Sequence, residues 1–158
     1  TELQNNTSKD STAFKDPSKE ANGELYIFIS FSLGGKALLN LAHEAKQFGA
    51  TLVLRGFHGG SYAKTAQSLQ NMITKTGQGV IIDPELYSLF SITAVPTYVL
   101  AKPFNMIAAE RTQTPVHDKL QGHVSPHYAL ETFAKDGDLK DEARGLLTER
   151  TLSKGVSK

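Results

Sequence analysis

The sequence lacks cysteine and tryptophan throughout its 158 residues. Without cysteine there are no disulfides, no thiolate nucleophile, no zinc–thiolate site and no CxxC redox centre. The chain also lacks an excess of either charge, because 17 Lys and Arg stand against 16 Asp and Glu, for a formal net charge of +1. Nucleic acids and anionic membranes are bound by clustered basic residues, so we expect neither as a partner.

Long hydrophobic runs are missing too, and no window of the sequence is apolar over the length that crosses a bilayer. We therefore expect no membrane insertion. The composition is that of a globular protein, with 39% hydrophobic residues and 8 Phe and 5 Tyr to fill a core. The first residue is Thr1 and not Met, so we expect a processed or trimmed product, and any export signal would precede Thr1.

The composition changes along the chain and predicts three parts. Residues 1–23 are polar with no sustained period, which predicts a flexible lead-in that cannot bury enough apolar surface to become ordered. Residues 24–135 alternate between strand-like and helix-like patterns, and we expect a single folded domain there. Residues 136–158 are expected to carry a C-terminal helix and a tail. There is no internal repeat.

The first half of the domain predicts the order β-α-β-α, for residues 24–31, 33–48, 51–54 and 61–75. Both strand segments are apolar on their two alternating faces, as in strands covered on both sides. The connecting helix ends at Gly49, and the two strands are expected to be parallel. The second helix begins at Ser61, its expected N-cap, and is predicted to bury Ala66, Leu69 and Ile73.

The second half predicts a strand-like run, a short helix, two strands and a helix, for residues 80–82, 84–90, 97–101, 107–111 and 125–135. Asp83 is the expected N-cap of the short helix. Residues 107–111 are expected to return antiparallel to 97–101. The last helix is expected to bury Ala129, Leu130 and Phe133.

This order of elements is that of a thioredoxin-like α/β domain, with a four-stranded mixed sheet and helices on both faces. Redox members of that fold carry CxxC at the start of the first helix, where the helix N-terminus lowers a thiol pKa. Here the slot holds Leu33, Gly34, Gly35 and Lys36. We therefore expect the fold without its redox chemistry and without a cofactor. The two glycines either shape the turn, which we favour, or leave amides free for an anion.

Pro96 falls where this fold places a cis-proline, so the Val95–Pro96 bond is expected to be cis, although only about 5–6% of X-Pro bonds are. In redox members this loop offers backbone groups to an extended peptide. Val95, Pro96 and Thr97 are therefore candidate partner-binding residues, together with the slot at 33–36. The alternative is that Pro96 only fixes the turn into the next strand.

Residues 55–61 form a glycine-rich segment before a helix, which invites comparison with a phosphate-binding loop. The spacing GxxxxGK[ST] fails because Ala63 stands where glycine is required. We interpret the segment as a helix-capping loop. Arg55, Phe57 and His58 are candidate partner-binding or structural residues, with Arg55 contacting backbone carbonyls or a partner carboxylate.

Metal binding is the first chemical alternative. His117, His123 and His127 lie close in sequence, but their spacing matches no zinc motif and no cysteine joins them. We interpret them as solvent-exposed loop histidines and predict no metal site.

A hydrolase site is the second alternative. Ser30 or Ser32 with His58 and Asp83 would supply the residue types, but the sequence has no GxSxG elbow. Asp83 also has a structural role as a helix cap.

Five short segments, taken together and in this order, are specific enough to indicate a family. They are residues 29–33 (ISFSL), 52–61 (LVLRGFHGGS), 82–87 (IDPELY), 94–99 (AVPTYV) and 122–125 (GHVS). With them, the chain resembles the TrbC family of pilus-assembly proteins of F-type conjugative transfer systems, across roughly residues 24–135.

The resemblance implies a Gram-negative periplasmic protein, exported with a cleaved signal, that acts in assembly of the conjugative pilus through a type IV secretion apparatus. It also implies TraW, another periplasmic assembly protein, as a direct partner. We therefore expect a non-catalytic protein-binding module with no small-molecule substrate. The alternatives left open are the hydrolase-like site and a domain that binds a peptide at the former redox slot.

Overall fold

A computed structural model describes residues 22–57, 61–104 and 113–156. The strands are β1 (Glu24–Ile29), β2 (Thr51–Leu54), β3 (Val80–Ile82), β4 (Thr97–Ala101) and β5 (His117–Gln121). The helices are α3 (Gly35–Gln47), α4 (Tyr62–Thr76), α5 (Pro84–Leu89), α6 (Pro126–Asp136) and α7 (Lys140–Val156), and a 3-10 turn, η1, spans Phe31–Leu33. Residues 1–21 of the predicted lead-in lie outside this description. None of the helices in it is long and apolar enough to cross a membrane.

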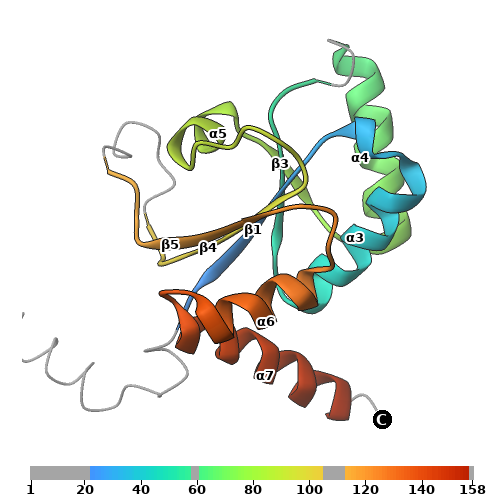
Figure 1. Ribbon diagram of the computed structural model, residues 1–158. Helices are drawn as coiled ribbons and strands as arrows, with labels where there is room; N and C mark the ends of the chain where they lie inside the picture. Colours follow the sequence, from blue (N-terminus) through green and yellow to red (C-terminus); the bar gives the residue numbers. More distant parts are fainter. Residues whose placement is uncertain (1–21, 58–60, 105–112, 157–158) are drawn as a thin grey trace, which may run out of the picture.

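The five strands form one mixed sheet in the order β3-β2-β1-β4-β5, with helices on both faces (Figure 1). β1, β2 and β3 are parallel, and β4 and β5 are antiparallel to their neighbours. The predicted α/β class, the mixed sheet and the two covered faces are confirmed. The predicted number of four strands is wrong, because the three-residue run at 80–82 pairs with β2 and adds an edge strand.

The antiparallel partner of β4 is β5, His117–Gln121, and not residues 107–111 as predicted. Residues 107–111 lie outside the described part of the chain. The sequence of β5, HDKLQ, has only one large apolar residue, Leu120, and so lacks the alternation that marks a strand. Polar and charged residues are typical of an edge strand, since they discourage pairing with other chains.

Two hydrophobic clusters lie on opposite faces of the sheet, and the alternation of side chains along β1 divides its residues between them. Leu25, Ile27 and Ile29 pack in the larger cluster with α3 and α6. Tyr26 and Phe28 pack in the smaller cluster with α5. This arrangement explains why both faces of the first strand are apolar in sequence.

The buried face of α4 differs from the prediction. Thr65, Met72 and Thr76 are buried and Leu69 is half-buried against the larger cluster, whereas Ala66 is exposed and Ile73 is 43% exposed. The threonine hydroxyls donate to backbone carbonyls four residues earlier in the helix, at 2.8 and 2.7 Å. The threonines can be buried because their hydroxyls are hydrogen-bonded within the helix. The buried face of α4 therefore includes Thr65 and Met72, each one residue before a position that the apolar pattern predicted.

The last two helices complete the larger cluster. The residues of α6 predicted to be buried are confirmed as such, namely Ala129, Leu130 and Phe133. Leu139 and Ala143, at the start of α7, belong to the same cluster. Glu142 of α7 pairs with Lys102, just after β4, at 2.5 Å. The connection between the helices is held by Asp118 of β5, whose carboxylate accepts hydrogen bonds from the amides of Asp138 and Leu139, both at 2.8 Å.

Candidate functional site

A cavity of about 600 Å³ opens at the carboxyl ends of β1 and β2. Its walls are residues 29–32 at the end of β1, residues 54–57 at the end of β2, Tyr87 of α5 and residues 92–95 before β4. The chain reaches β2 on one side of β1 and β4 on the other, so the cavity lies where the strand order reverses. Open α/β sheets bind ligands at such a point.

Tyr87 joins the two strand ends at the cavity. Its hydroxyl oxygen lies 2.8 Å from the carbonyl oxygen of Ile29 and 2.8 Å from that of Val53. Burial raises the pKa of Tyr87 to about 12, although the hydrogen bond to Ile29 and the charge of Arg55 act in the opposite direction. The hydroxyl is therefore neutral and serves as a hydrogen-bond donor to the backbone.

Two serines line the wall next to β1. The Ser32 hydroxyl lies 2.9 Å from the Ser30 hydroxyl oxygen, and Ser30 Oγ also accepts a hydrogen bond from the Ser32 amide at 3.2 Å. Ser30 is thereby the N-cap of η1. The serines are paired with each other, and no histidine, aspartate or glutamate is among the described residues that line this cavity.

The Val95–Pro96 peptide bond is cis, as predicted from the position of Pro96. The turn before it is closed by Thr97, whose hydroxyl donates to the carbonyl of Ala94 at 2.6 Å. Pro96 is buried, and its carbonyl accepts a hydrogen bond from the amide of Gly122. Val95 lines the cavity, and its amide and carbonyl have no backbone partner within the described segments.

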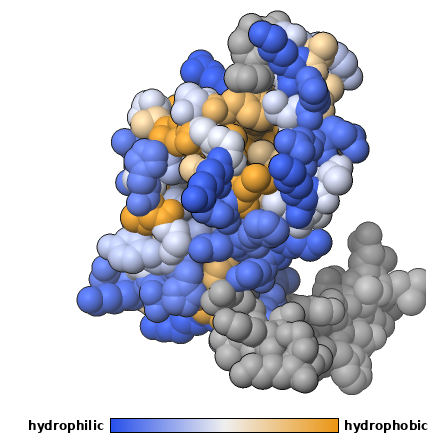
Figure 2. Space-filling model, turned by 90° about the vertical axis from the view of Figure 1, so that its right-hand side faces the viewer, coloured by the Kyte–Doolittle hydropathy of each residue, from blue (hydrophilic) through white to orange (hydrophobic). Residues whose placement is uncertain are grey.

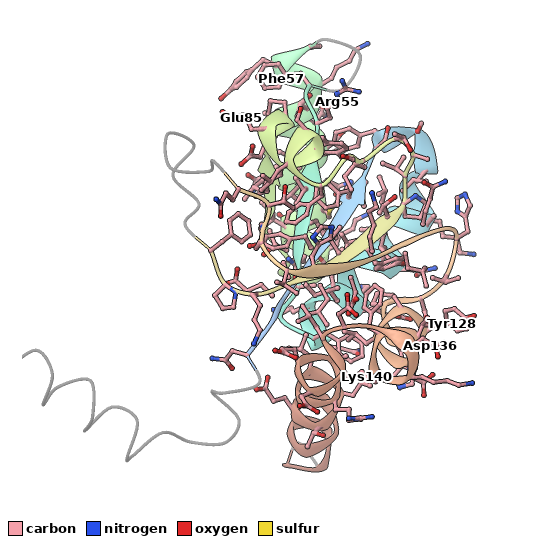
Figure 3. The ribbon with its side chains drawn as sticks, turned by 60° about the vertical axis from the view of Figure 1, so that its left-hand side comes forward. Arg55, Phe57, Glu85, Tyr128, Asp136 and Lys140 are labelled. Atoms are coloured by element: carbon pink, nitrogen blue, oxygen red, sulfur yellow. The ribbon has the colours of Figure 1, made fainter. Side chains whose placement is uncertain are left out.

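The rim of the cavity carries an exposed cation and exposed aromatic rings. Arg55 is exposed and has no ion pair to any described residue. Phe57 is 49% exposed, and its ring meets that of Tyr62 edge to face at 5.6 Å. Figure 3 shows Arg55 and Phe57 together at one end of the molecule, with Tyr128 near the opposite end. His58 lies outside the described residues.

The four residues predicted to occupy a lost redox slot, Leu33 to Lys36, lie around the start of α3. Gly34 is the N-cap of this helix with a φ of 94°, a conformation that residues with a side chain rarely adopt, and Gly35 is the first helical residue. Lys36 is exposed. Leu33 and Pro96 line a second cavity, so the structure brings these two predicted residues together.

The face that carries α3 and α4 shows hydrophobic residues exposed between hydrophilic ones (Figure 2).

The histidines are arranged differently from the prediction of three solvent-exposed loop residues. His117 is half-buried in β5, with its ring 4.9 Å from that of Phe90. His127 is half-buried in α6, where its ring nitrogen lies 3.3 Å from the carboxylate of Glu131. His123 alone is an exposed loop residue. No three His, Cys, Asp or Glu side chains converge among residues 22–57, 61–104 and 113–156.

The residues proposed for a hydrolase site are not all described. Asp83 accepts a hydrogen bond from the amide of Leu86 at 3.1 Å and caps α5, as predicted. The position of His58 is outside the description, so its relation to the serines stays a hypothesis.

Sequence reasoning missed part of the cavity wall. Tyr87, Ile92 and Thr93 line it, and none of them was a candidate. The available signal was positional, because residues at the carboxyl ends of parallel strands and beside a strand-order reversal are the expected wall of such a site.

Comparison with known proteins identifies relatives. The profile of the family described as type-F conjugative transfer system pilin assembly protein matches residues 27–133. Periplasmic protein TrbC of Escherichia coli (strain K12) is 31% identical over 131 residues, which are 82% of this chain and 56% of that protein. The chain thus spans just over half the length of this relative. No solved structure matches the chain significantly.

Proposed function

Because the chain belongs to the TrbC family of type-F conjugative transfer system pilin assembly proteins, we propose that it serves assembly of the conjugative pilus in the periplasm. It does so as a non-catalytic protein that binds other proteins of the transfer apparatus. The relative's name places that protein in the periplasm, which supports the proposed location.

The observation that carries this proposal is the open cavity at the carboxyl ends of β1 and β2. Its described lining offers apolar side chains, hydroxyls and one arginine, with no acid–base pair for catalysis. The exposed Phe57 ring at the rim is a typical anchor of a protein interface. The backbone groups of Val95, which have no backbone partner among the described residues, suit an extended segment of a partner, which adds beside a strand through main-chain hydrogen bonds.

The scaffold is proposed to be a thioredoxin-like domain that has lost its redox site. Four of the five strands, in the order β2-β1-β4-β5, support this, because β1 is parallel to β2 and antiparallel to β4. A cis-proline directly before β4 supports it as well. Leu33 and Lys36 stand at the two positions of the missing cysteines, so partner binding replaces thiol chemistry at the same edge of the sheet.

The proposed partner is TraW, in line with the family resemblance. Both the cavity and the former redox slot are available for it, with Val95 bordering one and Leu33 bordering the other. Arg55 at the rim, which forms no ion pair with a described residue, offers its positive charge to a carboxylate of the partner.

The experiment is complementation of a donor strain from which the gene for this protein has been deleted. The chain, exported to the periplasm, is expected to restore pili and DNA transfer. Thr93 is exposed at the cavity wall, so Thr93→Trp fills the cavity and is expected to abolish rescue while the protein stays folded. Lys135→Trp, at another exposed position, on α6, is the matched control and is expected to rescue. Full rescue by Thr93→Trp would exclude this cavity as the binding site.

A further inference from the structure

A second cavity, of about 200 Å³, adjoins the former redox slot. Val95 lines the first cavity, and the next residue, Pro96, lines this one. The second cavity is bordered by α3 from Ala37 to Glu44, the beginning of β4 and the loop between β5 and α6. Leu33, Leu41 and Val124 provide apolar wall, so its interior favours aliphatic groups.

Glu44 of α3 brings a carboxylate into this apolar cavity. Asn40 and Leu41 lie four and three residues before Glu44, so all three share the helix face that lines the cavity. The Oε2 atom of Glu44 is buried and has no hydrogen-bond partner among the described residues. No described cation forms an ion pair with it either. Buried polar atoms almost always have a partner, so an unpartnered carboxylate oxygen is an unusual feature of this cavity wall.

The polar neighbours of Glu44 in the cavity are occupied elsewhere or exposed. The Tyr98 hydroxyl donates its hydrogen to the carbonyl of Val124. Burial, and then the charge of Glu44, raise the pKa of Tyr98 above its ordinary value, so this hydroxyl stays neutral. His123 borders the cavity but is exposed and makes no ion pair with Glu44. The carboxylate therefore has no counter-charge from the described part of the protein.

A metal ion does not fit this cavity. Calcium and magnesium take about six or more oxygen ligands, and magnesium keeps several waters. Glu44 is the only carboxylate among the described residues that line the cavity, and the wall around it is mostly apolar. The ligand must supply one positive charge and an apolar body.

We propose that this cavity receives a lysine or arginine side chain of the partner protein. The inference rests on the proposed function and names the chemistry of the segment that docks there. The aliphatic stem packs against Leu33, Leu41 and Pro96, as the stems of basic side chains do on apolar surface. The cationic head pairs with Glu44 through a charge-assisted hydrogen bond. A basic residue thereby anchors the partner beside the larger cavity.

The test is an NMR titration of the full chain with side-chain analogues. The probes are n-butylguanidinium and n-butylammonium, with valerate, which has the same apolar stem and the opposite charge, as the control ligand. Both cations are expected to cause saturable shifts of the amides of Leu33, Glu44 and Val124, and valerate is not. Glu44→Gln is expected to weaken cation binding by about tenfold or more, the factor for one lost charge-assisted hydrogen bond.

Glu85→Gln is the matched control, because Glu85 is an exposed carboxylate on α5, away from this cavity, and its loss is expected to leave the titration unchanged. Glu44→Gln is also expected to keep or raise the melting temperature, since the buried Oε2 atom has no partner among the described residues. Equal cation binding by Glu44→Gln, no saturable shift with either cation, or a clear fall in its melting temperature would each overturn the proposal.

Complementation separates this inference from the proposed function. If the wild-type chain restores transfer and Glu44→Gln restores it equally, the basic anchor is wrong and the assembly role stands. If the wild-type chain does not restore transfer, the assembly role is wrong, whatever the titration shows.

Discussion

The hydroxyl of Tyr87 lies 2.8 Å from the carbonyl oxygen of Ile29, and this contact ties α5 to the end of the central strand. The same hydroxyl is 2.8 Å from the carbonyl oxygen of Val53 at the end of the neighbouring strand. One side chain from the smaller cluster therefore stabilises both strand ends from which the cavity wall continues. The shape of the cavity depends on this contact.

Tyr87→Phe tests the energetic role of that hydroxyl. We expect the free energy of unfolding to fall by about 1–3 kcal/mol, because two buried carbonyls lose their side-chain partner. Urea unfolding at neutral pH measures the change, and the m-value is expected to stay constant. Tyr128→Phe is the matched control, since Tyr128 is 53% exposed and its hydroxyl has no hydrogen bond within the described residues. Equal effects of the two substitutions would contradict this role.

The titration of Tyr87 predicts a loss of stability at high pH. Burial raises the pKa of Tyr87 from 10.0 to about 12 in the folded state. Its contribution is therefore fully present below pH 10 and is lost as the pH rises toward about 12, because the unfolded state ionises first. The wild-type free energy of unfolding should fall more steeply than that of Tyr87→Phe in this window, by at most about 1.4 kcal/mol per pH unit. Parallel curves for the two proteins would show that Tyr87 is not the titrating group.

Gly137→Ala tests the close packing between β5 and the turn that follows α6. A Cβ at this position would collide with the Asp118 carboxylate and would lie 2.8 Å from the carbonyl oxygen of Phe133. We expect destabilisation by about 1–3 kcal/mol, as for other overpacked sites.

Gly56→Ala is the control for this substitution, because a Cβ there has no atom of the described residues within 4 Å. It is expected to leave stability within about 0.5 kcal/mol or to raise it slightly, since alanine restricts the unfolded chain. Chemical denaturation of both variants measures the difference. If Gly137→Ala is as stable as Gly56→Ala, the contact between Asp118 and the turn is looser than described.

Local signals predicted much of the fold. Ser61, Asp83 and Ser125 were expected at helix starts, and each accepts a hydrogen bond from a backbone amide in the first turn of its helix. A cap needs only a short stretch of sequence, so it can be recognised without knowing the rest of the fold. The doubly covered β1 was predictable for the same reason, because its apolar residues are consecutive.

Features that depend on tertiary contacts were missed. The strand β5 is polar because it lies at the sheet edge, and its pairing with β4 is not visible in its own sequence. The buried threonines of α4 break the apolar pattern, since their hydroxyls bond to their own helix.

In the candidate site, the order of the elements was enough to predict Leu33 and Pro96 as site residues. It was not enough to predict Tyr87 and Glu44, because each reaches its cavity from a helix that packs against other elements of the fold.

The central claim is that the rim at Phe57 contacts another transfer protein, and site-specific photocrosslinking in donor cells tests it most directly. A photoreactive phenylalanine replaces Phe57 in one variant and Tyr128, an aromatic residue near the other end of the molecule, in the control (Figure 3). We predict that position 57 gives a crosslink to a component of the transfer system, identified by mass spectrometry, and that position 128 does not. No crosslink at position 57 in cells that transfer DNA normally, or the same product from both positions, would contradict the account.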